Sequence, residues 1–111
     1  MLLPPIRELR ARLTTPGAHV ALVERALAET ALPAAAHVYP TLLPEGALAA
    51  ARAADAALAA GRPLPALAGL PVTVKDLYDI AGRTTLAGSV LRQGAAPATQ
   101  DAEAVLRLKQ A

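Results

Sequence analysis

The sequence predicts an α/β fold made mostly of helices, with one or two short strands. Apolar residues recur at helical spacing in several stretches, whereas residues 70–75 alternate in the two-residue period of a strand. The 111 residues are enough for one small domain or a part of one. Two Tyr and no Phe or Trp leave Leu and Val to fill the core, so we expect that core to be thin.

Two amphipathic helices are expected near the start of the chain. Pro5 is tolerated in the first turn of the first helix, which ends near Thr14 and carries apolar residues at helical spacing. In the second helix, Thr15 is the expected N-cap and Pro16 takes the first helical position. This helix runs to about Glu29, with a buried stripe of Val20, Val23 and Leu27.

An alanine-rich helix is expected in the middle of the chain. Before it, residues 36–43 predict an extended connector or a short edge strand, because Pro40 lacks the backbone donor that a central strand needs. The helix begins after residues 44–46 and runs to Ala60. Gly61 is placed to end it.

Residues 70–75 have the clearest strand pattern. Successive side chains of a strand point to opposite faces, so one face would be apolar and the other would carry Thr73 and Lys75. Asp76 falls on the apolar side and is therefore not automatically the ion partner of Lys75. An ordered loop is expected over residues 82–94.

A last helix is expected from Asp101, with Ala102, Val105 and Leu106 at helical spacing. Neither Gln110 nor Ala111 is a helix terminator, so we expect the sequence to stop within or just at the end of an element.

Composition and charge argue against several classes of function. The 11 basic and 9 acidic residues give a net charge of +2 and form no basic stripe, so no nucleic-acid partner is expected. The absence of Cys excludes disulfides, thiolate metal sites and thiol nucleophiles, and it agrees with a cytoplasmic location. The N-terminus lacks the long apolar stretch of a signal peptide or membrane span, so no membrane partner is expected.

Lysine is scarce in this chain, which has two lysines beside nine arginines. Lys109 lies in a charged helical run and is expected at the surface, whereas Lys75 ends an apolar run. Enzymes of the α/β class often hold catalytic groups at the end of a strand, and burial would lower the pKa of such a lysine until its amine could act as a general base. The alternative is a lysine that extends its ammonium to water from a sheet edge, and the pattern alone leaves both open.

Residues 69–76 read Gly-Leu-Pro-Val-Thr-Val-Lys-Asp. Further polar and small residues follow this run: Asp79, Gly82, Thr84, Thr85, Ala87, Gly88 and Ser89. The alanine-rich helix closed by Gly61, Arg62 and Pro63 precedes it. In this combination and at this spacing the chain resembles the lysine segment of the amidase signature family, and the resemblance spans most of the sequence.

The resemblance implies a catalytic triad of a serine, a cis-peptide serine and a lysine, with no metal and no cofactor. Mapped residue by residue, only Lys75 falls in this chain, because the two serines of the family belong to a segment well downstream. The implied fold is a mixed sheet wrapped by helices, and residues 1–111 would form the N-terminal part of a single amidase domain.

Ser89 is the only serine in the sequence, so a self-contained dyad with Lys75 is an alternative. Such a dyad would still need an oxyanion hole and substrate walls, of which the sequence gives no sign, and a structural hydrogen bond is the favoured role for Ser89. Asp76 and Asp79 are expected to cap loop amides.

The two histidines, His19 and His37, have no ligand spacing to an acidic residue, so no metal site is expected. This leaves Lys75 as the one candidate catalytic residue.

The leading hypothesis is the N-terminal portion of an amidase that hydrolyses a small carboxylic amide, with Lys75 as general base and with no activity in the isolated chain. One alternative is the A subunit of a tRNA-dependent amidotransferase, in which the same triad releases ammonia from glutamine. Another is a truncated, noncatalytic remnant. The sequence is compatible with a homo-oligomer, and it does not identify the amide.

Overall fold

The computed structural model describes residues 4–111 and divides them into two compact units, one ending at Pro71 and one beginning at Val72. The described residues form four α-helices and two short 3₁₀ helices, η1 and η2, and no β-strand. Within the same residues, no helix is long and apolar enough to cross a membrane.

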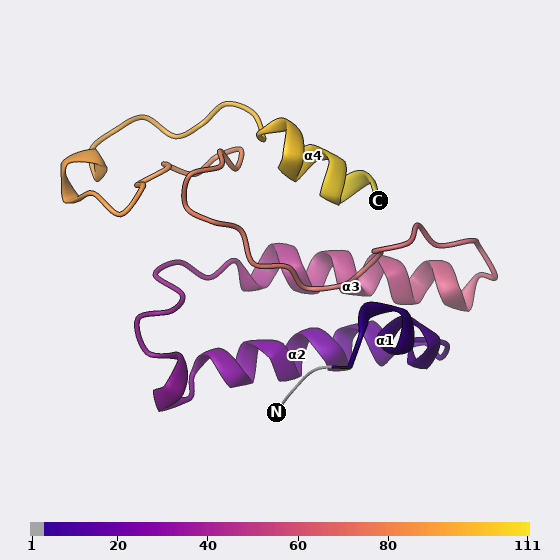
Figure 1. Cartoon of the computed structure of the whole chain (residues 1–111). Coiled ribbons are helices and arrows are strands. Elements are labelled where there is room, and N and C mark those ends of the chain that lie inside the picture. Colours follow the sequence, from indigo (N-terminus) through magenta and orange to yellow (C-terminus); the bar gives the residue numbers. More distant parts are fainter. Residues whose placement is uncertain (1–3) are drawn as a thin grey trace. The chain divides into compact units, whose positions relative to one another are not determined.

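The first unit is built on α2 (Ala18–Thr30) and α3 (Pro44–Ala59), which lie side by side, with the short α1 (Ile6–Arg12) near the start of α2 (Figure 1). These are the three helices expected in this part of the sequence. Between α2 and α3 the buried apolar side chains are small or medium in size: Leu22, Val23, Ala51 and Ala54. The two helices thus share the thin core that the composition predicts.

The start of α2 differs from the expectation. Gly17, with a φ of 93°, is the N-cap and offers no side-chain hydrogen bond. The carbonyl of Thr15 accepts a hydrogen bond from the Ala18 amide at 3.1 Å, so a turn separates Thr15 from the first helical residue. The prediction of Thr15 as N-cap was therefore wrong, while the end of the helix at Thr30 lies within one residue of the prediction.

The end of α3 follows the prediction at Gly61. This glycine has a φ of 67°, and its amide donates to the Leu58 carbonyl at 3.0 Å. The Arg62 amide donates to the Ala57 carbonyl at 2.9 Å, which completes the pair of bonds that characterises a Schellman motif. The chain then turns and runs back along α3 (Figure 1).

The connector between α2 and α3 contains η1 (Pro33–Ala35) and turns, so the connector interpretation of residues 36–43 is confirmed. The expected strand at residues 70–75 is not formed. A strand needs a neighbour to pair its backbone donors and acceptors, and no described segment supplies one to these residues. As a result Val72, placed on the apolar face of the expected strand, is 57% exposed.

The second unit consists of a long ordered loop with η2 (Val90–Arg92), followed by α4 (Glu103–Gln110). The predicted loop over residues 82–94 is confirmed, and Val105 is the residue of α4 that is buried. The helix begins at Glu103 and not at Asp101, because Asp101 lies in the loop and its carboxylate accepts the Ala81 amide at 2.9 Å.

Candidate functional site

Lys75 lies in the second unit, beside a cavity of about 210 Å³. The other residues that line this cavity are Thr73, Val74, Tyr78, Ala104, Val105 and Leu108. The side chain of Lys75 is exposed, and no carboxylate lines the cavity. The expectation of a buried lysine at the end of a strand is therefore not met, since the described residues form no sheet. The exposed side chain agrees with the alternative, a lysine that extends its ammonium to water.

The backbone turns sharply directly after Lys75. Its carbonyl oxygen accepts hydrogen bonds from the amides of Leu77 at 2.7 Å and Tyr78 at 3.1 Å. These two bonds fix the carbonyl end of the lysine residue and direct the chain into the loop that follows. The position of the Lys75 backbone within the second unit is thus defined locally.

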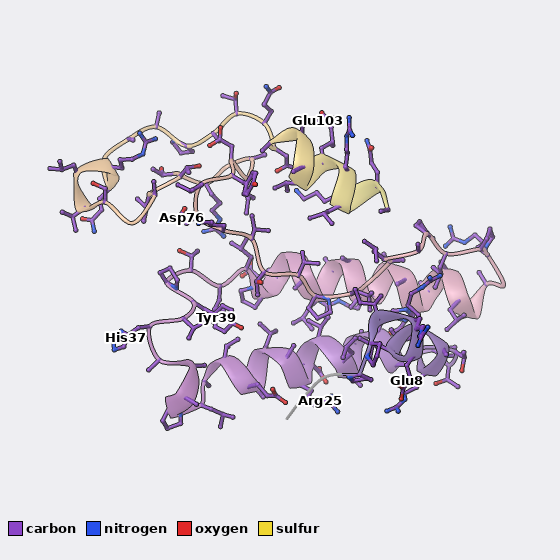
Figure 2. The ribbon with its side chains drawn as sticks, in the orientation of Figure 1. Glu8, Arg25, His37, Tyr39, Asp76 and Glu103 are labelled. Atoms are coloured by element: carbon purple, nitrogen blue, oxygen red, sulfur yellow. The ribbon has the colours of Figure 1, made fainter. Side chains whose placement is uncertain are left out.

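The loop after Lys75 is held by the two aspartates expected to brace it. Asp76 accepts the Leu86 amide through Oδ1 at 3.2 Å, and Figure 2 shows Asp76 on this segment. Asp79 accepts the Thr85 hydroxyl at 2.5 Å, and its carbonyl accepts the Ala102 amide at 2.9 Å. The prediction that both side chains cap loop amides is confirmed for Asp76 and is wrong for Asp79, whose side chain accepts a hydroxyl instead.

A second set of bonds joins the two ends of this loop. The Gly82 amide donates to the Ala98 carbonyl at 2.8 Å, and the Ala98 amide donates to the Arg83 carbonyl at 2.9 Å. Lys109 of α4 donates to Asp101 Oδ2 at 2.6 Å. This hydrogen bond, together with the one from the Ala81 amide, lowers the pKa of Asp101 below its ordinary value. Unlike Lys109, Lys75 has no ion-pair partner among the described residues.

Ser89 is engaged in local structure. Its hydroxyl oxygen accepts the Leu91 amide at 3.3 Å and caps η2. Among the described residues no hydrogen bond joins Ser89 to Lys75. The bond between the Leu91 amide and the Ser89 hydroxyl is the structural role that the sequence favoured for Ser89. The geometry gives no support to a dyad of Ser89 and Lys75.

The first unit contains a buried pair that the sequence reasoning missed. His19 of α2 is 2% exposed, and its Nδ1 lies 2.7 Å from Oδ1 of Asp55 on α3. The same carboxylate accepts the backbone amides of His19 at 3.2 Å and of Val20 at 3.1 Å. Asp55 therefore caps the open N-terminus of α2 from the neighbouring helix, a role in which a carboxylate is favoured by the helix dipole.

Hydrogen bonds from His19 and Val20 favour the ionised form of Asp55. Burial raises the pKa of Asp55, but the hydrogen bonds from the Val20 amide and from the His19 ring and amide outweigh it, and the pKa lies below the ordinary value. An ionised carboxylate only accepts hydrogen bonds, so Nδ1 of His19 is the nitrogen that carries the hydrogen.

A signal for this pair was present in the helical spacing. Leu48, Ala51, Asp55 and Leu58 recur at intervals of a helical face, and Asp55 is the one charged residue on it. A carboxylate on a buried stripe requires a donor, and a buried histidine on the adjacent helix is a suitable one. The sequence interpretation considered His19 only as a metal ligand and therefore missed Asp55, which lies 36 residues away in the sequence.

His37 lies on the connector between α2 and α3, exposed and with a positive φ of 67°, as Figure 2 shows for its position. Among the described residues no group of three or more His, Cys, Asp or Glu side chains is arranged to hold a metal ion.

A family model described as Amidase matches residues 21–111, which is most of the chain. The chain therefore belongs to this family. It is 54% identical over 67 residues to AtzE of Pseudomonas sp. (strain ADP), one of the subunits of 1-carboxybiuret hydrolase. Over 82 residues it is 46% identical to the A subunit of the glutamyl-tRNA(Gln) amidotransferase of Salinispora arenicola. A putative amidase, AmiA2, of Mycobacterium tuberculosis is 49% identical over 76 residues.

These relatives are much longer than the chain. The matches cover 60% of this chain and 15% of the Pseudomonas protein, and 74% of this chain and 16% of the Salinispora protein. Among solved structures, the chain resembles one from a vestigial protein complex connected with the evolutionary origins of an s-triazine catabolic enzyme. The TM-score is 0.79 and the identity is 39%, and the match covers 92% of this chain and 22% of that chain. An inhibitor-bound form of that complex gives a TM-score of 0.82 over 96% of this chain and 23% of that chain.

Proposed function

We propose that this chain supplies the lysine segment of an enzyme that hydrolyses a carboxylic amide, with Lys75 as the general base. The observation that carries the proposal is the match of residues 21–111 to the Amidase family. The run Gly-Leu-Pro-Val-Thr-Val-Lys-Asp at residues 69–76 supports the choice of lysine. The substrate class is a small molecule with an amide bond.

In the proposed reaction a serine attacks the amide carbonyl, and its proton passes through a second serine to Nζ of Lys75. The proton then goes to the leaving nitrogen, an acyl-enzyme remains, and water releases the acid. Both serines would come from outside this chain, because Ser89 is its only serine and its hydroxyl is bonded to the Leu91 amide.

Two local features of Lys75 support this role, although its side chain is exposed in this chain. Among the described residues its amine is not committed to an ion pair, whereas Lys109 is bonded to Asp101 at 2.6 Å. The carbonyl of Lys75 is fixed by two amides, so the residue has a defined backbone and a free side chain. A fixed backbone is one requirement for orienting a reacting group.

The proposal is tested in a graft enzyme, in which residues 4–111 replace the matching segment of AtzE. We expect the graft to hydrolyse 1-carboxybiuret, the compound in that relative's name. Replacing Lys75 by Met should reduce kcat by roughly 10² to 10⁴-fold, the usual contribution of a general base.

The matched control is Lys109→Met, which removes the other lysine and its ion pair with Asp101, in which the lysine side chain is 57% exposed. Its graft should keep kcat within about threefold of the parent, because surface ion pairs contribute little. Equal activity of the Lys75→Met graft and the parent graft would refute the assignment of Lys75.

A second candidate is the A subunit of an amidotransferase, supported by the 46% identity to the Salinispora protein. The proposed triad chemistry is the same, and the amide would be glutamine. Neighbouring genes for the B and C subunits would favour this candidate over a free-standing amidase.

A further inference from the structure

Gly69 opens the Gly-Leu-Pro-Val-Thr-Val-Lys-Asp run and lies against His19, the partner of Asp55, and against Ala54. A Cβ atom added at Gly69 would stand 2.8 Å from Cδ2 of the His19 ring and 2.9 Å from Cβ of Ala54, the residue before Asp55. Both distances are below any normal carbon contact. The position thus accepts only a glycine.

The backbone imposes the same requirement independently. Gly69 has a φ of 66°, which an L side chain rarely adopts. The two constraints are separable, because Gly61 has almost the same φ, 67°, and a Cβ atom added there would have nothing within 4 Å. Steric contact with His19 and Ala54 is therefore the property that Gly69 has and Gly61 lacks.

The surface that receives Gly69 is held rigid by Asp55. This carboxylate binds Nδ1 of His19 at 2.7 Å and the amides of His19 and Val20, so the ring cannot rotate without breaking a buried hydrogen bond. The side chains of His19 and Asp55 are 3% and 10% exposed. A buried pair held by several hydrogen bonds is restricted in the arrangements that it can adopt.

The two residues after Gly69 also have restricted backbone conformations. Pro71 has a fixed φ, and Leu70 before it is restricted to extended conformations. Lys75 follows Gly69 by six residues, a span of at most about 20 Å of extended chain. The restrictions on residues 69–71 therefore fix the direction in which the chain leaves the first unit.

We propose that His19, Asp55 and Gly69 are positioning residues for the lysine segment: the bonded pair receives Gly69 and sets the point and direction from which the chain runs to Lys75. The inference rests on the proposed role of Lys75. Neither His19 nor Asp55 touches a reacting atom in this scheme, and their effect is transmitted through the backbone.

The first test compares Gly69→Ala with Gly61→Ala in the graft enzyme. Both changes carry the same backbone penalty at positive φ, and only the first adds the contacts with His19 and Ala54. Gly69→Ala should lower kcat about 10- to 100-fold, as expected when a reacting group is displaced by about 1 Å. Gly61→Ala should keep kcat within about threefold, and KM should change little in either variant.

Two further variants keep the inference falsifiable if Gly69→Ala reduces folding. Ala54→Gly removes one of the two atoms that the new methyl would strike, so the double variant with Gly69→Ala should recover part of the lost kcat. Asp55→Asn keeps the side-chain size and removes an acceptor, and it should lower kcat several-fold. Its control is Glu45→Gln, an exposed acid on the same helix, which should leave kcat unchanged.

The outcomes separate the two proposals. If Lys75→Met abolishes activity while Gly69→Ala and Gly61→Ala give equal kcat, the positioning role is refuted and the assignment of Lys75 stands. A loss that appears in KM and not in kcat would also refute the positioning role. If Lys75→Met is active, the proposed function fails whatever the glycine variants do.

Discussion

Asp55 accepts the hydrogen bonds that link α2 to α3 in the first unit. One carboxylate receives the ring of His19 and two amides of the first turn of α2, in a chain whose helix α2 has no side-chain cap of its own. Removing a partner from a buried group leaves the other groups unsatisfied, which costs more than the bonds themselves contribute. The Asp55 side chain is therefore important for the stability of α2 and α3, because several buried donors depend on it.

The ionisation of Asp55 predicts a loss of stability in acid. Its folded-state pKa is below the ordinary value, so the carboxylate stabilises the fold above the unfolded-state pKa of about 4, and this contribution is lost as the pH falls through the folded-state pKa. His19 is the titratable group that faces it. We expect the magnitude of the negative ellipticity at 222 nm to decrease as the pH falls below about 4 and the capping carboxylate is protonated.

Asp55→Asn should be less helical at pH 7 and should show a smaller change on acidification, because the group that titrates has gone. Asp101→Asn is the comparison, since the pKa of Asp101 is also lowered but its carboxylate holds the loop of the second unit. Equal acid transitions in the wild type and Asp55→Asn would contradict the assignment.

At the scale of elements, α3 is defined by the small side chains on its buried face. Ala51 is 0% exposed and Ala54 is 5% exposed, so the buried face of α3 carries only methyl groups at these two positions. A close-packed contact of this kind has no room for extra methylene groups.

Ala51→Leu should therefore destabilise the first unit by about 1–3 kcal/mol, the usual cost of overpacking a core. Ala53→Leu is the matched control, because Ala53 is on the same helix and exposed, and it should change the free energy of unfolding by no more than about 0.5 kcal/mol. Urea titrations followed at 222 nm measure both. A destabilisation equal for the two variants would rule out the close contact.

The helices could be predicted because their signals are local. Gly61 predicts the end of α3 to within one residue, whereas the helix begins at Pro44 and not after residue 46 as predicted. Features that depend on distant residues were missed. The expected strand at residues 70–75 has no partner strand among the described residues. The helix-capping role predicted for Thr15 is performed by Asp55, which follows the capped residues by 36 and 35 positions. The motif predicted the segment around Lys75, but spacing alone could not pair His19 with Asp55.

At the scale of the whole molecule, the described residues have little buried apolar surface. The buried hydrophobic side chains are Leu22, Val23, Ala51, Ala54 and Val105, and Val105 is the one in the second unit. Large side chains are exposed in the second unit, with Leu91 92% exposed and Val90 74% exposed. Hydrogen bonds, more than apolar burial, thus hold the second unit.

This distribution predicts stepwise unfolding of the chain. We expect a broad thermal transition by circular dichroism, and amide exchange should show the second unit losing protection before α2 and α3, because it has the smaller apolar core. A single sharp transition, with amides of both units losing protection together, would be inconsistent with this prediction.

The cap on α2 also has a consequence for synthesis of the chain. The first-turn amides of α2 emerge from the ribosome well before Asp55, which follows them by 36 and 35 residues. Until Asp55 has emerged, these amides can be satisfied only by water, and the helix is open to fraying. Completion of α2 is therefore expected to wait for α3, so that the two helices become stable together during translation and not in the order of their synthesis.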